Sequence, residues 1–171
     1  DLSRTNLSGA DLSGATLYGA TLVNARLVST RLTFADLTGS IVVGAAFAEA
    51  DLADAVMRFV IFDDLDLSKL TLVRTDLTNS SFINTNLRGA DLTDARLANA
   101  DFTDANLTDA VLSGASLSGA TLDRANVIDA DFSNTTALDT ATFGGAFHNA
   151  PPEQPPEPIG TLWPADFDPD A

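Results

Sequence analysis

The chain of 171 residues contains no cysteine, one histidine, one tryptophan and one lysine. Without cysteine, disulfide bonds, thiolate metal sites and a cysteine nucleophile are excluded. The chain has nine basic and 24 acidic residues, and its formal net charge is −15 at pH 7. Such a chain has no electrostatic footprint for nucleic acid or an anionic membrane surface. No apolar run approaches the roughly 18 residues of a membrane span, so we expect neither nucleic-acid binding nor membrane insertion.

A large apolar residue recurs at every fifth position, as in ADLTDARLANADFTDANLTDA at residues 90–110. From Leu2 to Phe132 the pattern runs through 27 consecutive pentads without a change of phase, and the central residue is Leu in 19 of them. Two positions before each centre lies a small residue, which is Ala in 17 of the 26 pentads between positions 5 and 130. The residue before the centre is often Asp or Asn. A repeat this regular decides the fold.

Neither regular element can bury a ladder of period five. In an α-helix five residues turn by about 500°, so successive centres lie about 140° apart. In a flat strand an odd period sends successive centres to opposite sides. A backbone that turns a corner once per pentad removes the conflict, because the centre and the small residue can then both point inward. Gly, Asn, Asp and Ser suit the corners, and stacked coils can pair at about 4.8 Å.

The pentads ADLSG, ADLTD, ANLTD and ADFTD closely resemble the pentapeptide-repeat family, whose pattern is A(D/N)LXX. The resemblance covers about residues 1–134. It implies an all-β fold, a right-handed quadrilateral parallel β-helix of about seven coils. Each coil would contain four pentads, with Leu or Phe stacked along the axis.

The remaining residues depart from the repeat. We expect a β-helix over residues 1–134, an irregular last coil over 135–150, and a proline-rich connector with a C-terminal tail over 151–171. The tail contains Trp163 and Phe167 between prolines. A solenoid end exposes core and backbone edges, so we interpret Trp163 and Phe167 as a cap. A linear motif that binds a partner is the alternative.

The sequence offers little for catalysis. Its single imidazole, His148, lies in the irregular part, and no phosphate loop or metal-ligand spacing occurs. Acidic residues cluster in two places, but a solvated surface on a repeat rich in Asp explains them better than a cation site. The clusters are Asp63, Asp64 and Asp66, and Asp101, Asp104 and Asp109. We therefore expect no enzyme activity, no cofactor and no metal.

Apolar residues occupy several outward positions where most pentads have Thr, Ser or Asp. Residues twenty apart stack on one face, so the first three coils should carry a strip of them. Contiguous apolar surface on a rod marks a partner site; β-branched support of the stack, or cover by the tail, are the alternatives. This predicted partner surface, the apolar strip, consists of Tyr18, Val23, Phe34, Ile41, Val43, Val56, Phe59, Ile61 and Ile83.

Three bulky residues interrupt the small inward position beside the strip. Val60, Leu65 and Leu70 replace Ala at three of the four corners of roughly one coil. Because the core must widen there or shift a centre, we predict a local distortion.

Two functions are compatible with these features. The first is a non-enzymatic interaction or scaffold module, a rigid acidic rod that docks a protein partner through the strip or its ends; a homodimer through an uncapped end belongs to this hypothesis. The second follows from the resemblance: quinolone-resistance members are similar to B-DNA in size and negative surface and bind gyrase or topoisomerase IV. The compartment stays open between the cytoplasm and, if a signal was removed, the periplasm or thylakoid lumen.

Overall fold

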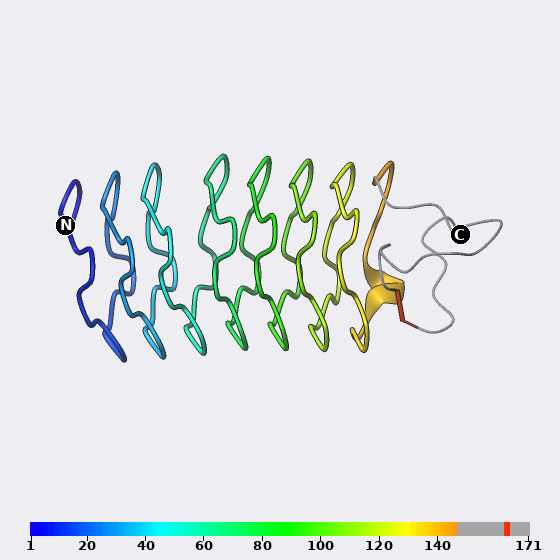
Figure 1. The fold of residues 1–171 in the computed structure, drawn as a ribbon, viewed down its shortest axis with the longest axis horizontal. Helices are drawn as coiled ribbons and strands as arrows, with labels where there is room; N and C mark the ends of the chain where they lie inside the picture. The colour runs from blue at the N-terminus through cyan, green and yellow to red at the C-terminus, as the bar shows by residue number, and fades with distance from the viewer. Residues whose placement is uncertain (147–162, 165–171) are drawn as a thin grey trace.

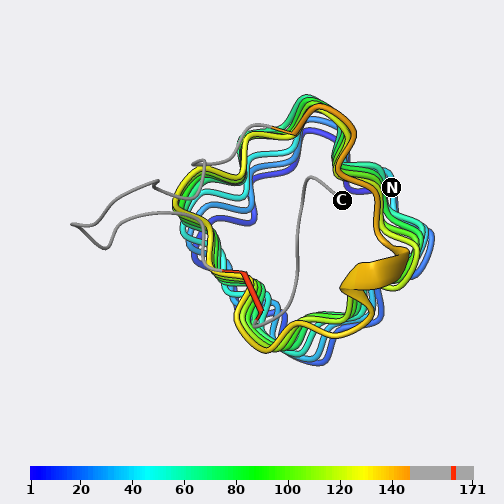
Figure 2. The ribbon, with the colours of Figure 1, turned by 90° about the vertical axis from the view of Figure 1, so that its right-hand side faces the viewer.

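The chain winds into a rod of stacked coils. In the computed structural model, which describes residues 1–146 and 163–164, parallel bridges join residues twenty positions apart, from Asn6 with Arg26 to Ser116 with Thr136. Figure 1 shows the coils side by side along the rod, and the end view in Figure 2 has four sides. Four pentads therefore complete each coil, as the family resemblance implies.

Every pentad ends in a tight turn. In a typical one, the Ala95 amide donates to the Leu92 carbonyl at 3.0 Å, and Asp94 between them has a φ of 56°. The second residue after the centre has a positive φ in all 27 pentads. Gly, Asn and Asp adopt this left-handed backbone most readily, which explains why they are common at this position.

The Asp or Asn that precedes 13 of the 27 centres also has a local task. The Asp101 carboxylate accepts a hydrogen bond from the Thr103 amide at 2.9 Å, and the Asn106 amide oxygen accepts one from Thr108 at 3.1 Å. Such an Asx turn supplies an acceptor to the residue after the centre. The amide of that residue donates to no backbone carbonyl of a neighbouring coil in the described chain. The repeat pattern thus encodes backbone hydrogen bonding as well as burial.

The centres and the small residues form one continuous core. Leu92 and Leu97 are fully buried, as are the alanines that precede them. Phe62, Phe82 and Phe102 stack along the axis with ring centroids 4.9 and 4.8 Å apart. Burying each such side chain contributes roughly 2 kcal/mol, so the narrow core is sufficient to hold the rod together.

We name the four faces after their first centres. The Leu2 face contains the pentads centred on Leu2, Leu22, Val42, Phe62, Phe82, Phe102 and Leu122. The Leu7, Leu12 and Leu17 faces follow in chain order around the coil, each with its pentads twenty residues apart.

The expected distortion is present where coil 40–59 meets coil 60–79, a junction we call the seam. The amides after the three bulky residues, those of Ile61, Asp66 and Thr71, donate to no backbone carbonyl of coil 40–59. After Thr75, which is small, the Asp76 amide still donates to Ala55 at 2.9 Å. Bulk at three corners therefore separates the coils beside those corners.

The seam is looser on two faces than on the other two: Ile41 and Ile61 still pair across it on the Leu2 face, and no pairing joins Ala46 to Asp66 on the Leu7 face. The amides of Val42, Gly44, Phe47 and Glu49, on the Leu2 and Leu7 faces, have no carbonyl partner in coil 60–79. On the Leu17 face, Met57 still donates to Asp76 at 2.7 Å. Figure 1 shows the wider gap between the cyan and green coils at one side of the rod only. Val60 and Leu70 are buried, whereas Leu65 stays half-buried.

The repeat changes after Phe132. A 3-10 helix, η1 (Leu138–Thr140), takes up one extra residue, so Thr121 pairs with Thr142, at a spacing of 21 rather than 20. Of the expected C-terminal regions, residues 147–162 and 165–171 lie outside the described structure. Within the part that is described, no helix has the length and apolarity to cross a bilayer.

Candidate functional site

Most of the apolar strip is open to solvent. Among its seven exposed members, the exposed fraction ranges from 37% for Ile83 to 71% for Tyr18. Val23 and Val56 are half-buried. The remaining members are exposed: Phe34, Ile41, Val43, Phe59 and Ile61.

The structure gathers only part of the strip into one patch. Val23, Ile41, Val43, Ile61 and Ile83 share the Leu2 face, in two adjacent columns, and Asp63 interrupts one of them. Phe59 lies at the turn that leads from the Leu17 face to Ile61. Tyr18 and Val56 lie on the Leu17 face, and Phe34 lies at the end of a Leu12 pentad. The Leu2 face is therefore the densest part of the candidate surface.

Three strip residues occupy the position before the centre, where many other pentads have Asp or Asn. Ile41, Val56 and Ile61 stand directly before a centre, where Asp or Asn would accept a hydrogen bond. The amides that would donate, those of Val43, Arg58 and Asp63, have no protein acceptor in the described structure. Each replacement forgoes about 0.5–1.5 kcal/mol of net hydrogen bonding. Stability of the repeat does not explain these apolar residues.

Two strip aromatics occupy strained backbone. Phe34 and Phe59 have φ values of 60° and 58°, at the turn position that Gly, Asn and Asp usually fill. A bulky residue in this region costs of the order of 1–2 kcal/mol. Both rings are mostly exposed, so core packing offsets little of that cost. Strain with exposure is typical of a functional surface.

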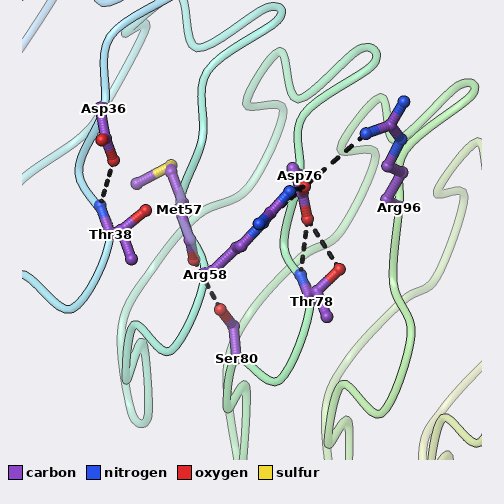
Figure 3. Close-up of polar contacts among 8 residues, drawn as sticks. All are labelled: Asp36, Thr38, Met57, Arg58, Asp76, Thr78, Ser80 and Arg96. Atoms are coloured by element: carbon purple, nitrogen blue, oxygen red, sulfur yellow. Dashed lines mark hydrogen bonds and ion pairs between the residues drawn. The ribbon is translucent and has the colours of Figure 1, made fainter.

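Ion pairs between neighbouring coils neutralise part of the acidic charge along the rod. Figure 3 shows Arg58 reaching from coil 40–59 to Asp76 on coil 60–79, with Arg96 of the next coil on the far side. The Arg58 Nη2 to Asp76 Oδ2 distance is 2.5 Å, and the Arg96 Nη1 to Asp76 Oδ2 distance is 3.8 Å. On the Leu12 face, Arg74 forms a bidentate pair with Asp54. These two close pairs clamp the sides of the seam that stay closed.

Asp76 is the one buried acid among the described residues. Burial raises the pKa of Asp76, but the hydrogen bonds from Arg58 and Thr78 and the charge of Arg58 outweigh it, so that pKa lies below its ordinary value. The hydrogen bond from Arg74 likewise lowers the pKa of Asp54. Both carboxylates are held ionised at neutral pH.

The Leu2 face differs in charge from the other three. From Ala20 to Asp104 its pentads contain no Lys or Arg, whereas each other face carries at least two bases. Its acids include Asp63 and Asp64, which are in no ion pair of the described structure. Asp63 accepts hydrogen bonds from Ser81 and the Ile83 amide, and Asp64 accepts one from Asn84. Sequence reasoning missed this feature, although sorting the charges by position within the twenty-residue coil would have found it.

The residues considered for catalysis or metal binding do not come together into a site in the described part of the chain. His148 and Phe167 lie outside the described residues. Across residues 1–146 and 163–164, no group of three His, Cys, Asp or Glu side chains is placed to hold a metal ion. Most of the two acidic clusters bind neighbouring protein groups: Asp66 accepts from Ser68, Asp104 pairs with Arg124, and Asp109 pairs with Arg88.

Trp163 lies against the C-terminal end of the core. Its ring stacks on Phe132 with centroids 4.8 Å apart and meets Phe143 edge to face at 5.3 Å. The ring of Trp163 thus lies beyond the last centre of the Leu12 face. The role of Trp163 as a cap stays a prediction.

Comparisons with known proteins agree with this geometry. The model of pentapeptide repeats matches in eight copies over residues 1–33, 30–68, 61–99, 72–109 and 100–136. Comparison with curated proteins yields no match.

Solved structures of repeat proteins resemble the chain. HetL, a pentapeptide repeat protein involved in heterocyst differentiation regulation from the cyanobacterium Nostoc sp. strain PCC 7120, is 34% identical, over 85% of this chain and 64% of HetL, with a TM-score of 0.47. This chain thus spans less than two thirds of HetL. Full-length QnrB1, a plasmid-mediated fluoroquinolone resistance protein, is 17% identical over 83% of this chain and 90% of QnrB1, with a TM-score of 0.54.

A pentapeptide repeat protein from the Arabidopsis thaliana thylakoid lumen is 25% identical over 84% of this chain and 81% of its own, with a TM-score of 0.32. The likeness to QnrB1 shows the fold alone, a β-helix solenoid, which is right-handed in these proteins. The pentads, the coil of twenty residues and the family match over residues 1–136 lead to one conclusion: the chain belongs to the pentapeptide repeat family.

Proposed function

We propose that the chain is a non-enzymatic interaction module that docks a partner protein through the apolar strip. Repeat-protein interaction modules are the class to which its structural relatives point. One observation carries the docking surface: exposed Ile41 and Ile61 stand where an Asx residue would stabilise the turn. At these positions the strip has exposed apolar residues, which favour binding to a partner, in place of Asp or Asn, which would stabilise the turn.

Capture of a partner from an extract of the source cell tests this function. Replacing Ile41, Val43 and Ile61 together by Thr should abolish capture and leave the far-UV circular dichroism unchanged, because Thr occupies the corresponding position in other pentads. A matched control replaces Val73, Val111 and Ile128 by Thr, which lie at similar positions outside the strip. Equal capture by both variants would refute the proposed surface.

A DNA mimic that binds gyrase or topoisomerase IV is the second candidate. The net charge of −15 and the shared fold with QnrB1 favour it. The arginines that pair with acids along the rod oppose it, because they break the negative surface: Arg31, Arg58, Arg74, Arg88, Arg96 and Arg124. This candidate predicts inhibition or protection in a gyrase supercoiling assay at micromolar protein, and no effect there would count against it.

A further inference from the structure

We infer that the Leu2 face of coils 20–39 to 80–99 binds an extended peptide segment in which apolar and basic side chains alternate. This inference rests on the proposed docking function and names the chemistry of the partner. Three features of this face coincide: exposed Ile and Val side chains, acids without bases, and backbone groups left open by the seam.

Charge is the first of these features. Asp63 and Asp64 have no ion-pair partner in the described structure, and no base lies on this face between Ala20 and Asp104. The remaining faces carry arginines, of which several are already paired. A cationic partner therefore meets acids and no base along this stretch of the Leu2 face, whereas every other face carries at least two bases.

Apolar contact is the second feature. Ile41, Val43 and Ile61 are each about half-exposed or more and lie on adjacent coils, beside Phe59. Their columns place apolar groups immediately next to Asp63 and Asp64. A segment that alternates apolar and basic residues matches both kinds of group at once.

The open seam is the third feature. In the described chain the Gly44 amide and the Asp63 carbonyl, which would bond each other in a closed ladder, have no hydrogen-bond partner. Gly44 and Ile61 are exposed. An extended segment offers both donors and acceptors along its backbone, and this is how peptides add to exposed strand edges. A helical partner has no backbone donors and acceptors free along its length, because they bond to each other within the helix.

Other occupants fit less well. Nucleic acid would be repelled by the acids. A second copy of the chain carries the same net charge of −15 and would bring Asp63 and Asp64 against further acids.

Titration calorimetry with synthetic peptides tests the inference. The probe is a 12-residue peptide that alternates Val and Lys; the matched peptides replace every Val by Ser or every Lys by Glu. We expect the Val–Lys peptide to bind at least tenfold more tightly than either control, and its affinity to fall between 50 and 300 mM NaCl. Equal binding of the Ser–Lys peptide would overturn the inference, because charge alone would then suffice.

Variants of the chain locate the site. Ile61→Thr should weaken binding about tenfold and Asp64→Asn about threefold. Val111→Thr and Asp94→Asn are the controls: they stand at the equivalent pentad positions on the Leu12 face, and Asp94 has the same left-handed backbone as Asp64. They should leave binding unchanged, and equal losses in both pairs would overturn the inference.

The two proposals fail in different ways. If the cellular partner is lost from the Ile41, Val43 and Ile61 variant but its bound segment proves acidic or uncharged, the docking function stands and this inference falls. If the strip variant captures the partner normally, the docking function itself falls.

Discussion

At the scale of single residues, the positions that break the repeat are the informative ones. Most turns place Gly, Asn or Asp in the left-handed conformation, where those residues cost little. Phe59 occupies the same conformation with its ring largely in solvent. Phe59 therefore lowers the stability of the folded chain, and a contact with a binding partner would compensate for this loss.

Replacing Phe59 by Asn should stabilise the rod. We expect the free energy of unfolding to rise by about 1 kcal/mol, because Asn adopts a positive φ with less strain. Urea unfolding followed by circular dichroism measures the change. The converse substitution, Asn99→Phe, lies two coils further along the same column and should destabilise by a similar amount. A loss of stability in Phe59→Asn would contradict the argument.

Asp76 gives the rod a dependence on acid. Because its pKa in the folded chain lies below that of an unfolded Asp, near 3.9, its ion pair contributes stability above about pH 4. That contribution is lost as the pH falls through the folded-state pKa.

Asp76→Asn separates the charge from the turn. Asn86 and Asn106 show that Asn at this pentad position still accepts the turn hydrogen bond, so the variant keeps that bond and loses the charged contacts with Arg58 and Arg96. We expect a loss of about 1–3 kcal/mol at pH 7 and a smaller decrease in stability between pH 5 and pH 2 than in the unsubstituted chain. Chemical unfolding across that range measures both, and parallel pH profiles would show that Asp76 is not the source.

At the scale of the coil, the small inward residue controls the spacing of the backbone. Where Ala occupies it, the amide that follows donates to a carbonyl of the preceding coil at about 2.8–3.0 Å. Where Val60, Leu65 and Leu70 occupy it, the amides that follow lose those bonds. Buried Ser40, beside the seam, is left with no partner for its hydroxyl in the described structure.

The seam should be visible in amide hydrogen exchange. The Gly44 amide should exchange at least about tenfold faster than that of Asp64, which stands one coil later and donates to Ile83 at 3.1 Å. Changing Val60, Leu65 and Leu70 to Ala should close the ladder and slow exchange at Gly44 while Asp64 stays unchanged. Equal rates at the two amides in the unsubstituted chain would show that the seam is closed in solution.

At the scale of the whole molecule, the rod is a one-dimensional stack whose ends have fewer neighbours than its middle. The leucines of the first coil are only half-buried. At the other end, Trp163 stacks on Phe132 and extends the axial core. Since the chain has one tryptophan, its fluorescence reports this end alone.

Phe132→Ala tests whether Trp163 covers the end of the core. Loss of the stacking partner should shift the tryptophan emission to longer wavelength and lower the stability by about 3–5 kcal/mol. Phe102→Ala removes an equally buried ring from the Phe stack of the Leu2 face, away from Trp163, so it should destabilise similarly without shifting the native emission. An unchanged emission in Phe132→Ala would refute the cap.

Much of the fold followed from the period of five. A pentad that must bury its centre and its small residue has to turn once per repeat, so the core was correctly predicted from the period. The coil of four pentads, and with it the membership of each face, was predicted from the family resemblance. The exposure of Tyr18, Phe34 and Ile61 followed from the same rule. The position of the distortion at Val60 was predicted, but the loss of hydrogen bonds between the coils there was not.

What the sequence determined by itself is whatever every pentad repeats: the turn, the buried positions and the order of the faces, because local backbone geometry is the same in each. The tertiary structure decided how neighbouring coils respond to one another. It selected Arg58 and Arg96 as the partners of Asp76, opened the seam on two faces only, and placed Trp163 over Phe132. Those outcomes depend on contacts between residues 18 or more positions apart, where several partners compete and only packing in three dimensions decides among them.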